Sequence, residues 1–215
     1  MKTATITLVL ALAALGAGCT TTLDRSRNLA DPNVPAKTLA QQVCSNCHGV
    51  DGNSISPNFP KLAAQQEEYL IGQLKMFRSH KRDDPPGFEY MWGISRSLTD
   101  AQIKGLAEYF AAQKSVSPGP GDPKLAAEGK RIFHKGLPAQ GVPPCATCHG
   151  DQGQGNGQFP RIANQHSDYV IKQLTVFQRT NERPDGVAMK AITHSLSDGN
   201  MKAVAAYLQD MAAVK

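Results

Sequence analysis

The stretch Cys44-Ser45-Asn46-Cys47-His48-Gly49 recurs later in the chain as Cys145-Ala146-Thr147-Cys148-His149-Gly150. In each copy two cysteines stand three positions apart, and a histidine follows the second one directly. This spacing is typical of covalent c-type haem attachment, in which each thiol forms a thioether with the porphyrin and the histidine binds the iron. The sequence therefore predicts two covalently bound c-type haems. They would be attached at Cys44, Cys47, Cys145 and Cys148, with His48 and His149 as axial ligands.

Three other uses of such cysteines compete with this prediction: a disulfide, a thioredoxin-like redox pair and a zinc site. A redox pair needs a strand–helix context, which neither motif has. A zinc site needs a further pair of cysteines or histidines in each copy, and the remaining histidines are not spaced in that way. Because the whole motif occurs twice at matching places, we favour haem attachment.

The chain outside the motifs is also duplicated. Phe59-Pro60 recurs as Phe159-Pro160, and Leu98-Thr99-Asp100 recurs as Leu196-Ser197-Asp198. Between the copies, residues 117–123 are rich in proline and glycine, which is typical of a linker. We predict a first domain over 36–116 and a second over 124–215.

Each copy is predicted to be helical. Leu70, Leu74 and Phe77 fall on one helical face, and Thr99 and Ser197 are placed as N-caps of the last helices. No segment shows the alternation of a strand, so the expected fold class is all-α. Copies this short bury little apolar surface by themselves, and aromatic residues make up only 6% of the chain. A haem in each domain would supply the missing apolar mass.

The sixth iron ligand decides between electron transfer and catalysis, because an open coordination position admits peroxide or dioxygen. A ligand used by both haems should occur at the same place in both copies, and the spare histidines do not. Met91 and Met189 do, since each lies seven residues before the repeated leucine. We predict both as axial ligands, carried on loops that cross the distal haem faces. The alternative is that they are core packing.

The N-terminus has the features of a secretory signal over residues 1–18, with Lys2 ahead of a short apolar run. Cys19 then follows a stretch similar to a bacterial lipobox, although Gly16 stands where an aliphatic residue is usual. We favour a lipid anchor at Cys19, and the alternative is ordinary cleavage nearby. Residues 19–35 are expected to form a polar tether.

The charge pattern excludes some functions. The formal net charge is +5 without a run of basic residues, so nucleic-acid binding has no support. No apolar stretch long enough for a membrane span occurs beyond the N-terminus. For Arg78, Lys81 and Arg82 we expect a solvated helix end, and the alternative is a basic cluster near the first haem.

Taken together, the paired motifs, the Cys47–Asn53 run, the Asn58–Ala63 stretch and the late methionines resemble the cytochrome c4 family of dihaem class I c-type cytochromes. The resemblance implies two class I cytochrome c folds facing each other. It also implies that the carbonyls of Pro60 and Pro160 accept hydrogen bonds from His48 and His149.

The expected function is that of an electron carrier without catalytic activity, in the bacterial periplasm. It would pass single electrons between redox proteins, from a quinol-oxidising complex to a terminal oxidase. One alternative is an electron-transfer subunit of a periplasmic dehydrogenase. A less favoured one is a dihaem peroxidase, which needs an open haem.

Overall fold

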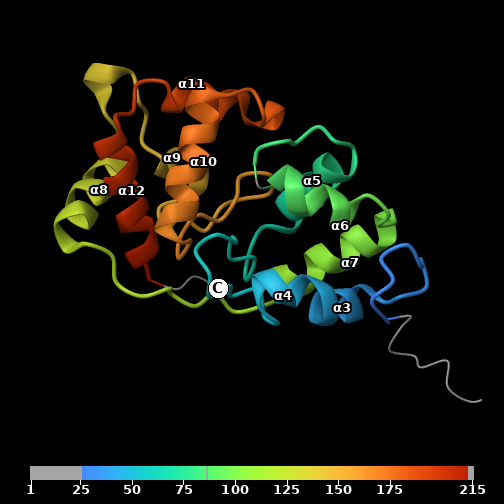
Figure 1. Cartoon of the computed structure of the whole chain (residues 1–215). Helices are drawn as coiled ribbons and strands as arrows, with labels where there is room; N and C mark the ends of the chain where they lie inside the picture. Colours follow the sequence, from blue (N-terminus) through green and yellow to red (C-terminus); the bar gives the residue numbers. More distant parts are fainter. Residues whose placement is uncertain (1–25, 86, 213–215) are drawn as a thin grey trace, which may run out of the picture.

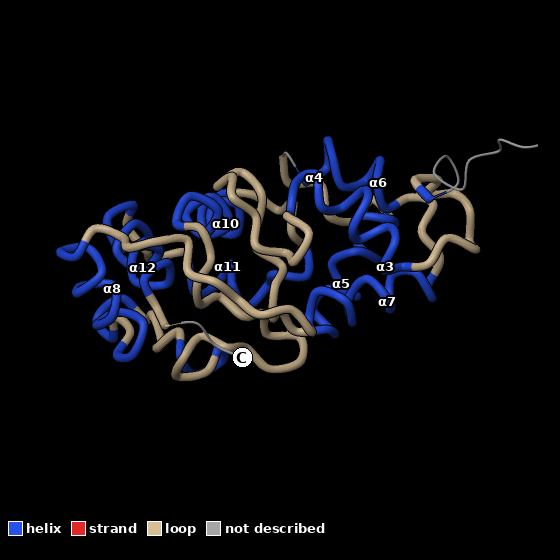
Figure 2. The backbone as a smooth tube through the Cα atoms, turned by 90° about the horizontal axis from the view of Figure 1, so that it is seen from below, coloured by secondary structure: helices blue, strands red, loops and turns tan. Residues whose placement is uncertain are grey.

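The computed structural model describes residues 26–85 and 87–212. Figure 1 shows two helical halves side by side, the first coloured blue to green and the second yellow to red. Within the described ranges the only extended pairing is two isolated bridges, and everything else is helix, turn or loop (Figure 2). The prediction of an all-α chain in two parts is confirmed.

The first half contains short helices around its cysteine motif and two longer helices. Most of the helix packing in this half involves one of the two longer helices. Its elements are α3 (Ala36–Leu39), the π-helical turn η2 (Ala40–Cys44), α4 (Ser45–His48), α5 (Glu67–Arg78), the π-helical turn η3 (Gly87–Trp92), α6 (Gly93–Ser95) and α7 (Asp100–Ala111).

The second half repeats this plan with a longer first helix. Its elements are α8 (Pro123–Lys135), the 3₁₀ turn η4 (Pro138–Gln140), α9 (Ala146–His149), α10 (Ser167–Arg179), the 3₁₀ turn η5 (Pro184–Gly186), α11 (Val187–Thr193) and α12 (Asp198–Asp210). The helix α8 ends before an irregular segment that precedes the second motif, whereas α3, η2 and α4 run on without a break into the first motif.

Each half has its own hydrophobic core. In the first, Leu39 and Ile103 are fully buried among the residues of α3 and α7. In the second, Ile132 and Phe133 of α8 are fully buried against α12. Two separate cores are what a duplicated domain requires.

The crossing of α8 and α12 depends on Gly129. A Cβ atom there would lie 1.9 Å from the backbone oxygen of Ala203 and 2.8 Å from the Cβ of Tyr207. The helices can approach this closely only because position 129 has no side chain. The last helices begin as predicted, with capping boxes at Thr99 and Ser197.

The end of the predicted tether packs against the first half. Val34 is 5% exposed and belongs to the first core. The amide of Gln102 donates hydrogen bonds to the backbone oxygens of Asp31 (3.0 Å) and Val34 (3.1 Å). The stretch before α3 is therefore attached to α7 rather than free in solution. The predicted signal and Cys19 lie outside the described residues, and none of the described helices is long and apolar enough to span a membrane.

Candidate functional site

The two cysteine motifs occupy matching helical turns. Cys47 and His48 lie on α4 directly after Cys44, and Cys148 and His149 lie on α9 directly after Cys145. All four cysteines are unpaired, so neither motif contains a disulfide. Both helices end at a glycine with positive φ, 78° at Gly49 and 79° at Gly150, which turns the chain away beneath the histidine.

The thiols are poor candidates for redox or zinc chemistry. Burial raises the pKa of Cys44 and of Cys145 to about 11, so neither free thiol forms a thiolate readily near neutral pH. Among residues 26–85 and 87–212, no three His, Cys, Asp or Glu side chains come together to hold a metal ion. Both observations favour thioether attachment over the alternatives.

The two histidines are held in the same orientation. The Nδ1 of His48 lies 2.9 Å from the Pro60 oxygen, and the Nδ1 of His149 lies 2.9 Å from the Pro160 oxygen. The carbonyl accepts, so Nδ1 carries the proton and Nε2 keeps its lone pair. Burial lowers the pKa of both rings, more than the proline carbonyls raise it, which favours the neutral form that binds metals. Within the described chain neither Nε2 has a hydrogen-bond partner, as an iron ligand requires.

A backbone clamp fixes the segment that carries each proline. In the first half the Gly52 oxygen accepts from the amides of Leu62 (2.7 Å) and Ala63 (3.1 Å). In the second half the Gly153 oxygen does the same for Ile162 (2.8 Å) and Ala163 (3.0 Å). The proline carbonyl is thereby set at a constant position relative to the motif.

The two methionines lie on helical turns, and the prediction of loops there is wrong. Met91 is part of η3 and Met189 is part of α11. Each backbone oxygen accepts from a fully buried hydroxyl four residues on, from Ser95 at 2.6 Å and from Thr193 at 2.8 Å. Of the described residues, Met189 packs against the second core, whereas Met91 is not part of the first.

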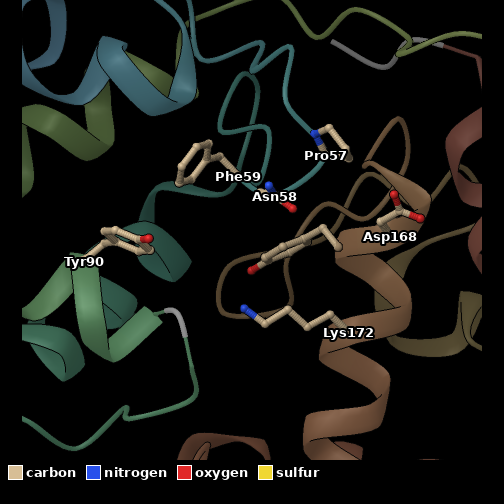
Figure 3. Close-up of a pocket in the computed structure, with 7 residues that line it drawn as sticks. Pro57, Asn58, Phe59, Tyr90, Asp168 and Lys172 are labelled. Carbon is tan, nitrogen blue, oxygen red and sulfur yellow. The ribbon is translucent and has the colours of Figure 1, made fainter.

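A cavity of about 330 Å³ lies between the first half and α10 of the second, and its lining residues are Pro57, Asn58, Phe59 and Tyr90 of the first half and Asp168, Tyr169 and Lys172 of α10 (Figure 3). Phe59 and Tyr90, which precede Pro60 and Met91, contribute to its lining from the first half and contact each other edge to face, with ring centroids 6.3 Å apart. The Phe59 ring also lies 6.2 Å from that of His48. The motif thiols and the imidazole with a free Nε2 fit a haem, and the cavity borders this site at Phe59.

Two buried guanidinium groups each have one nitrogen without a partner in the described part of the chain. The Nε atoms of Arg161 and Arg183 are buried and, among the described residues, have no hydrogen-bond partner. Burial lowers the pKa of Arg161 to about 10. The other nitrogens of both groups are bonded, those of Arg161 to the backbone oxygens of Ala163 and Lys61 and those of Arg183 to Gln73, Gln173 and Asp185.

The halves meet in a reciprocal glutamine contact. The side chain of Gln65 accepts from the amide of Arg161 at 2.6 Å and donates to its oxygen at 3.0 Å. Gln165 does the same for Lys61, at 2.8 Å and 3.1 Å. Each glutamine therefore bonds both the backbone amide and the backbone oxygen of the residue that follows the proline of the other half. The residues before the glutamines, Ala64 and Asn164, have positive φ values of 53° and 56°. This backbone conformation directs each glutamine toward the other half.

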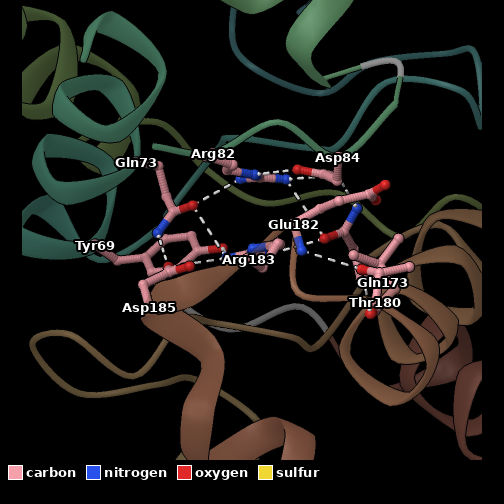
Figure 4. Close-up of polar contacts among 10 residues, drawn as sticks. Tyr69, Gln73, Arg82, Asp84, Gln173, Thr180, Glu182, Arg183 and Asp185 are labelled. Atoms are coloured by element: carbon pink, nitrogen blue, oxygen red, sulfur yellow. Dashed lines mark hydrogen bonds and ion pairs between the residues drawn. The ribbon is translucent and has the colours of Figure 1, made fainter. Parts of the chain in front are cut away.

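A second, buried part of this interface joins α5 and α10 (Figure 4). Arg82 donates to Asp84 at 2.6 Å and to Gln73 at 2.7 Å, and the amide of Gln173 donates to Asp84 at 3.2 Å. Arg183 reaches back to Gln73 at 3.0 Å. Arg82 also lies 4.5 Å from the centre of the Phe77 ring. The expectation of a solvated helix end is wrong for Arg82, which is only 5% exposed.

The interface residues escaped the sequence analysis, although a signal was present. Tyr69, Gln73 and Arg82 recur as Tyr169, Gln173 and Arg183 at the spacing of the cysteine motifs or within one residue of it. Polar residues that recur between duplicated domains without belonging to the motif are candidates for the surface that the domains share.

Comparison with known proteins agrees with this geometry. The family model for cytochrome c matches residues 34–114 and 126–212. Cytochrome c4 of Stutzerimonas stutzeri is 40% identical over 178 residues, which cover 79% of this chain and 84% of the relative. A thiosulfate dehydrogenase electron acceptor of Thiomonas intermedia is 31% identical over 170 residues, covering 77% and 76%. The solved Acidithiobacillus ferrooxidans cytochrome c4 superposes with a TM-score of 0.73 at 41% identity, over 78% of this chain and 98% of that one.

Proposed function

Since this chain belongs to the cytochrome c4 family of dihaem electron carriers, we propose that it passes single electrons along a bacterial periplasmic respiratory chain. Its donor would be a quinol-oxidising complex and its acceptor a terminal oxidase. The chain carries two covalently bound c-type haems in two tandem cytochrome c domains. Haem supplies the one-electron chemistry, and the protein holds it, sets its potential and excludes other reactions.

The observation that carries the proposal is the identical setting of His48 and His149. Both rings are 7% exposed, and both Nδ1 atoms lie 2.9 Å from a proline carbonyl. Each histidine and the hydrogen bond that orients it are therefore duplicated together, as expected if both rings serve the same purpose. In this proposal the four motif cysteines form the thioethers and the two histidines are the proximal ligands.

Met91 and Met189 are proposed as the distal ligands. Their support is the matched place in both copies and the matched hydroxyl bond to each backbone oxygen. A neutral thioether sulfur favours reduced iron and raises the reduction potential. Two haems closed in this way would conduct electrons at the oxidising end of a chain and would not bind peroxide.

A second candidate function is that of electron acceptor for a periplasmic dehydrogenase. Its support is the relative named as the electron acceptor of thiosulfate dehydrogenase. The same ligands serve both functions, so the two differ only in the protein that docks. Co-purification of a dehydrogenase with the chain would favour this second function, whereas co-purification of an oxidase would favour the first.

The decisive experiment is a redox titration of the purified holoprotein followed by visible spectroscopy. We expect two haems per chain, thioether-to-iron charge-transfer bands in the oxidised protein, and no carbon monoxide binding at either iron. Rapid carbon monoxide binding together with peroxide turnover would contradict the carrier function and favour a peroxidase.

Export and anchoring are part of the proposal. The chain would be secreted through the signal over residues 1–18 and held at a membrane by a lipid on Cys19. Mass spectrometry of the mature N-terminus tests both, because an unmodified first residue would exclude the anchor.

A further inference from the structure

Lys172 belongs to α10 of the second half, yet it lines the cavity of the first half. Figure 3 shows its side chain reaching from α10 toward the side of the cavity where Tyr90 lies. Tyr90 precedes Met91, Phe59 precedes Pro60, and the Phe59 ring lies 6.2 Å from that of His48, so this cavity borders the first haem site. The second half therefore places a residue of α10 beside the first haem site.

The ammonium group of Lys172 is not committed to another contact. Within the described chain it has no hydrogen-bond or ion-pair partner, although the side chain is half-buried. Burial lowers the pKa of Lys172, and the carboxylate of Asp84 acts in the opposite direction. The carboxylate of Asp168, one turn earlier on α10, lines the same cavity but forms no ion pair with Lys172, so the ammonium is available to a group that binds beside it.

The position equivalent to Lys172 in the first half carries no cation. Tyr69 and Gln73 of α5 align with Tyr169 and Gln173 of α10, so position 72 is the counterpart of Lys172. That position is a glycine, and a Cβ built there would meet no atom within 4 Å. The helix α10 thus carries a lysine at this position and α5 does not.

We propose that Lys172 raises the reduction potential of the haem bound at Cys44 and Cys47 and leaves the other haem almost unchanged. The inference rests on the proposed function, because it requires a haem between His48 and Met91. Reduction adds a negative charge to the iron centre, so a nearby cation stabilises the reduced form more than the oxidised form. The asymmetry would set the order in which the two haems accept electrons.

The test is a redox titration of the full-length holoprotein carrying Lys172→Gln, in two backgrounds that separate the haems. Met189→His lowers the potential of the second haem, and Met91→His lowers that of the first, because imidazole favours reduced iron less than thioether does. In both backgrounds we expect the first haem's equilibrium constant for reduction to fall roughly five- to tenfold. Tenfold corresponds to about 59 mV for one electron.

Two control variants make the result specific. Lys172→Arg keeps the charge and should restore the potential to nearly that of the parent. Lys202→Gln removes the same charge from an exposed position on α12 and should leave both potentials unchanged.

The outcomes separate this inference from the proposed function. Absence of either haem, or of both methionine charge-transfer bands in the parent protein, would refute the proposed function. With both haems and both bands present, no shift, an equal shift of both haems, or a shift of the second haem alone would overturn the inference. A purely structural role would lower the unfolding temperature of Lys172→Gln without a change in potential, which also overturns it.

Discussion

Replacing Asp84 by Asn should be among the most damaging single changes at the interface between the halves. The Asp84 side chain is 1% exposed and that of its partner Arg82 is 5% exposed. Burial alone raises the pKa of Asp84, but the hydrogen bonds and charge of Arg82 outweigh it and hold the pKa below its usual value. Asparagine at this position leaves a buried guanidinium without its counter-charge.

The size of the loss in unfolding free energy depends on the interactions that Arg82 keeps. Breaking a buried ion pair by removing one partner costs about 3–5 kcal/mol. Arg82 keeps its 2.7 Å bond to Gln73 and its position over the Phe77 ring. We therefore expect the lower end, about 3 kcal/mol of unfolding free energy.

Two matched variants give a graded series. Asp185 occupies the equivalent place in the second half but is 24% exposed, so Asp185→Asn should cost about 1.5 kcal/mol, the value of a hydrogen bond to a charged group. Asp100 pairs with Arg78 at the surface and is 70% exposed, so Asp100→Asn should change stability little.

The assay is equilibrium unfolding in urea, followed by circular dichroism and by the fluorescence of Trp92. If the slope of unfolding free energy against urea concentration is the same in all variants, the shifts in midpoint report stability. The deficit of Asp84→Asn should persist above the pKa of an unfolded aspartate, about 3.9. It should disappear as the pH falls through the lower pKa of the folded state. Equal losses in all three variants, or the largest loss at Asp100, would refute the reasoning.

Three further predictions follow from the packing and the sites. Gly129→Ala should destabilise the second half by about 2 kcal/mol, because its Cβ would lie 1.9 Å from a backbone oxygen; Gly72→Ala, with no atom near, should be neutral or stabilising by about 0.5–1 kcal/mol in the same urea assay. Met91→Ala and Met189→Ala should each abolish the charge-transfer band of one haem, and an unchanged spectrum would exclude that methionine as a ligand. Burial lowers the pKa of His166, so the wild type should lose stability as the pH falls below about 6.5; His166→Gln should flatten this dependence in unfolding measured from pH 7 to pH 5.

The sequence predicted the features that depend on local chemistry. The cysteine motifs, the helical fold class and the caps at Thr99 and Ser197 all follow from short-range rules on spacing and hydrogen bonding. The bonds from His48 and His149 to the proline carbonyls were implied by family resemblance, and the structure shows both.

The features that depend on contacts between distant residues could not be predicted. Arg82 and Gln165 are of types that normally face water, and nothing in their immediate sequence shows that the other half covers them. The helical setting of Met91 depends on a π-helical turn, for which the sequence analysis had no signal. Val34 lies among polar residues, so its burial under α7 was hidden by its neighbours.

The reciprocal bonds of Gln65 and Gln165 have the pattern of an isologous dimer, in which each copy gives the other what it receives. The segment over residues 117–123 joins the two copies covalently. Pairing that would otherwise depend on protein concentration thus becomes intramolecular, with an effective concentration in the millimolar range for a short flexible connection. Dilution therefore cannot separate the two iron centres, and both reach a redox partner together.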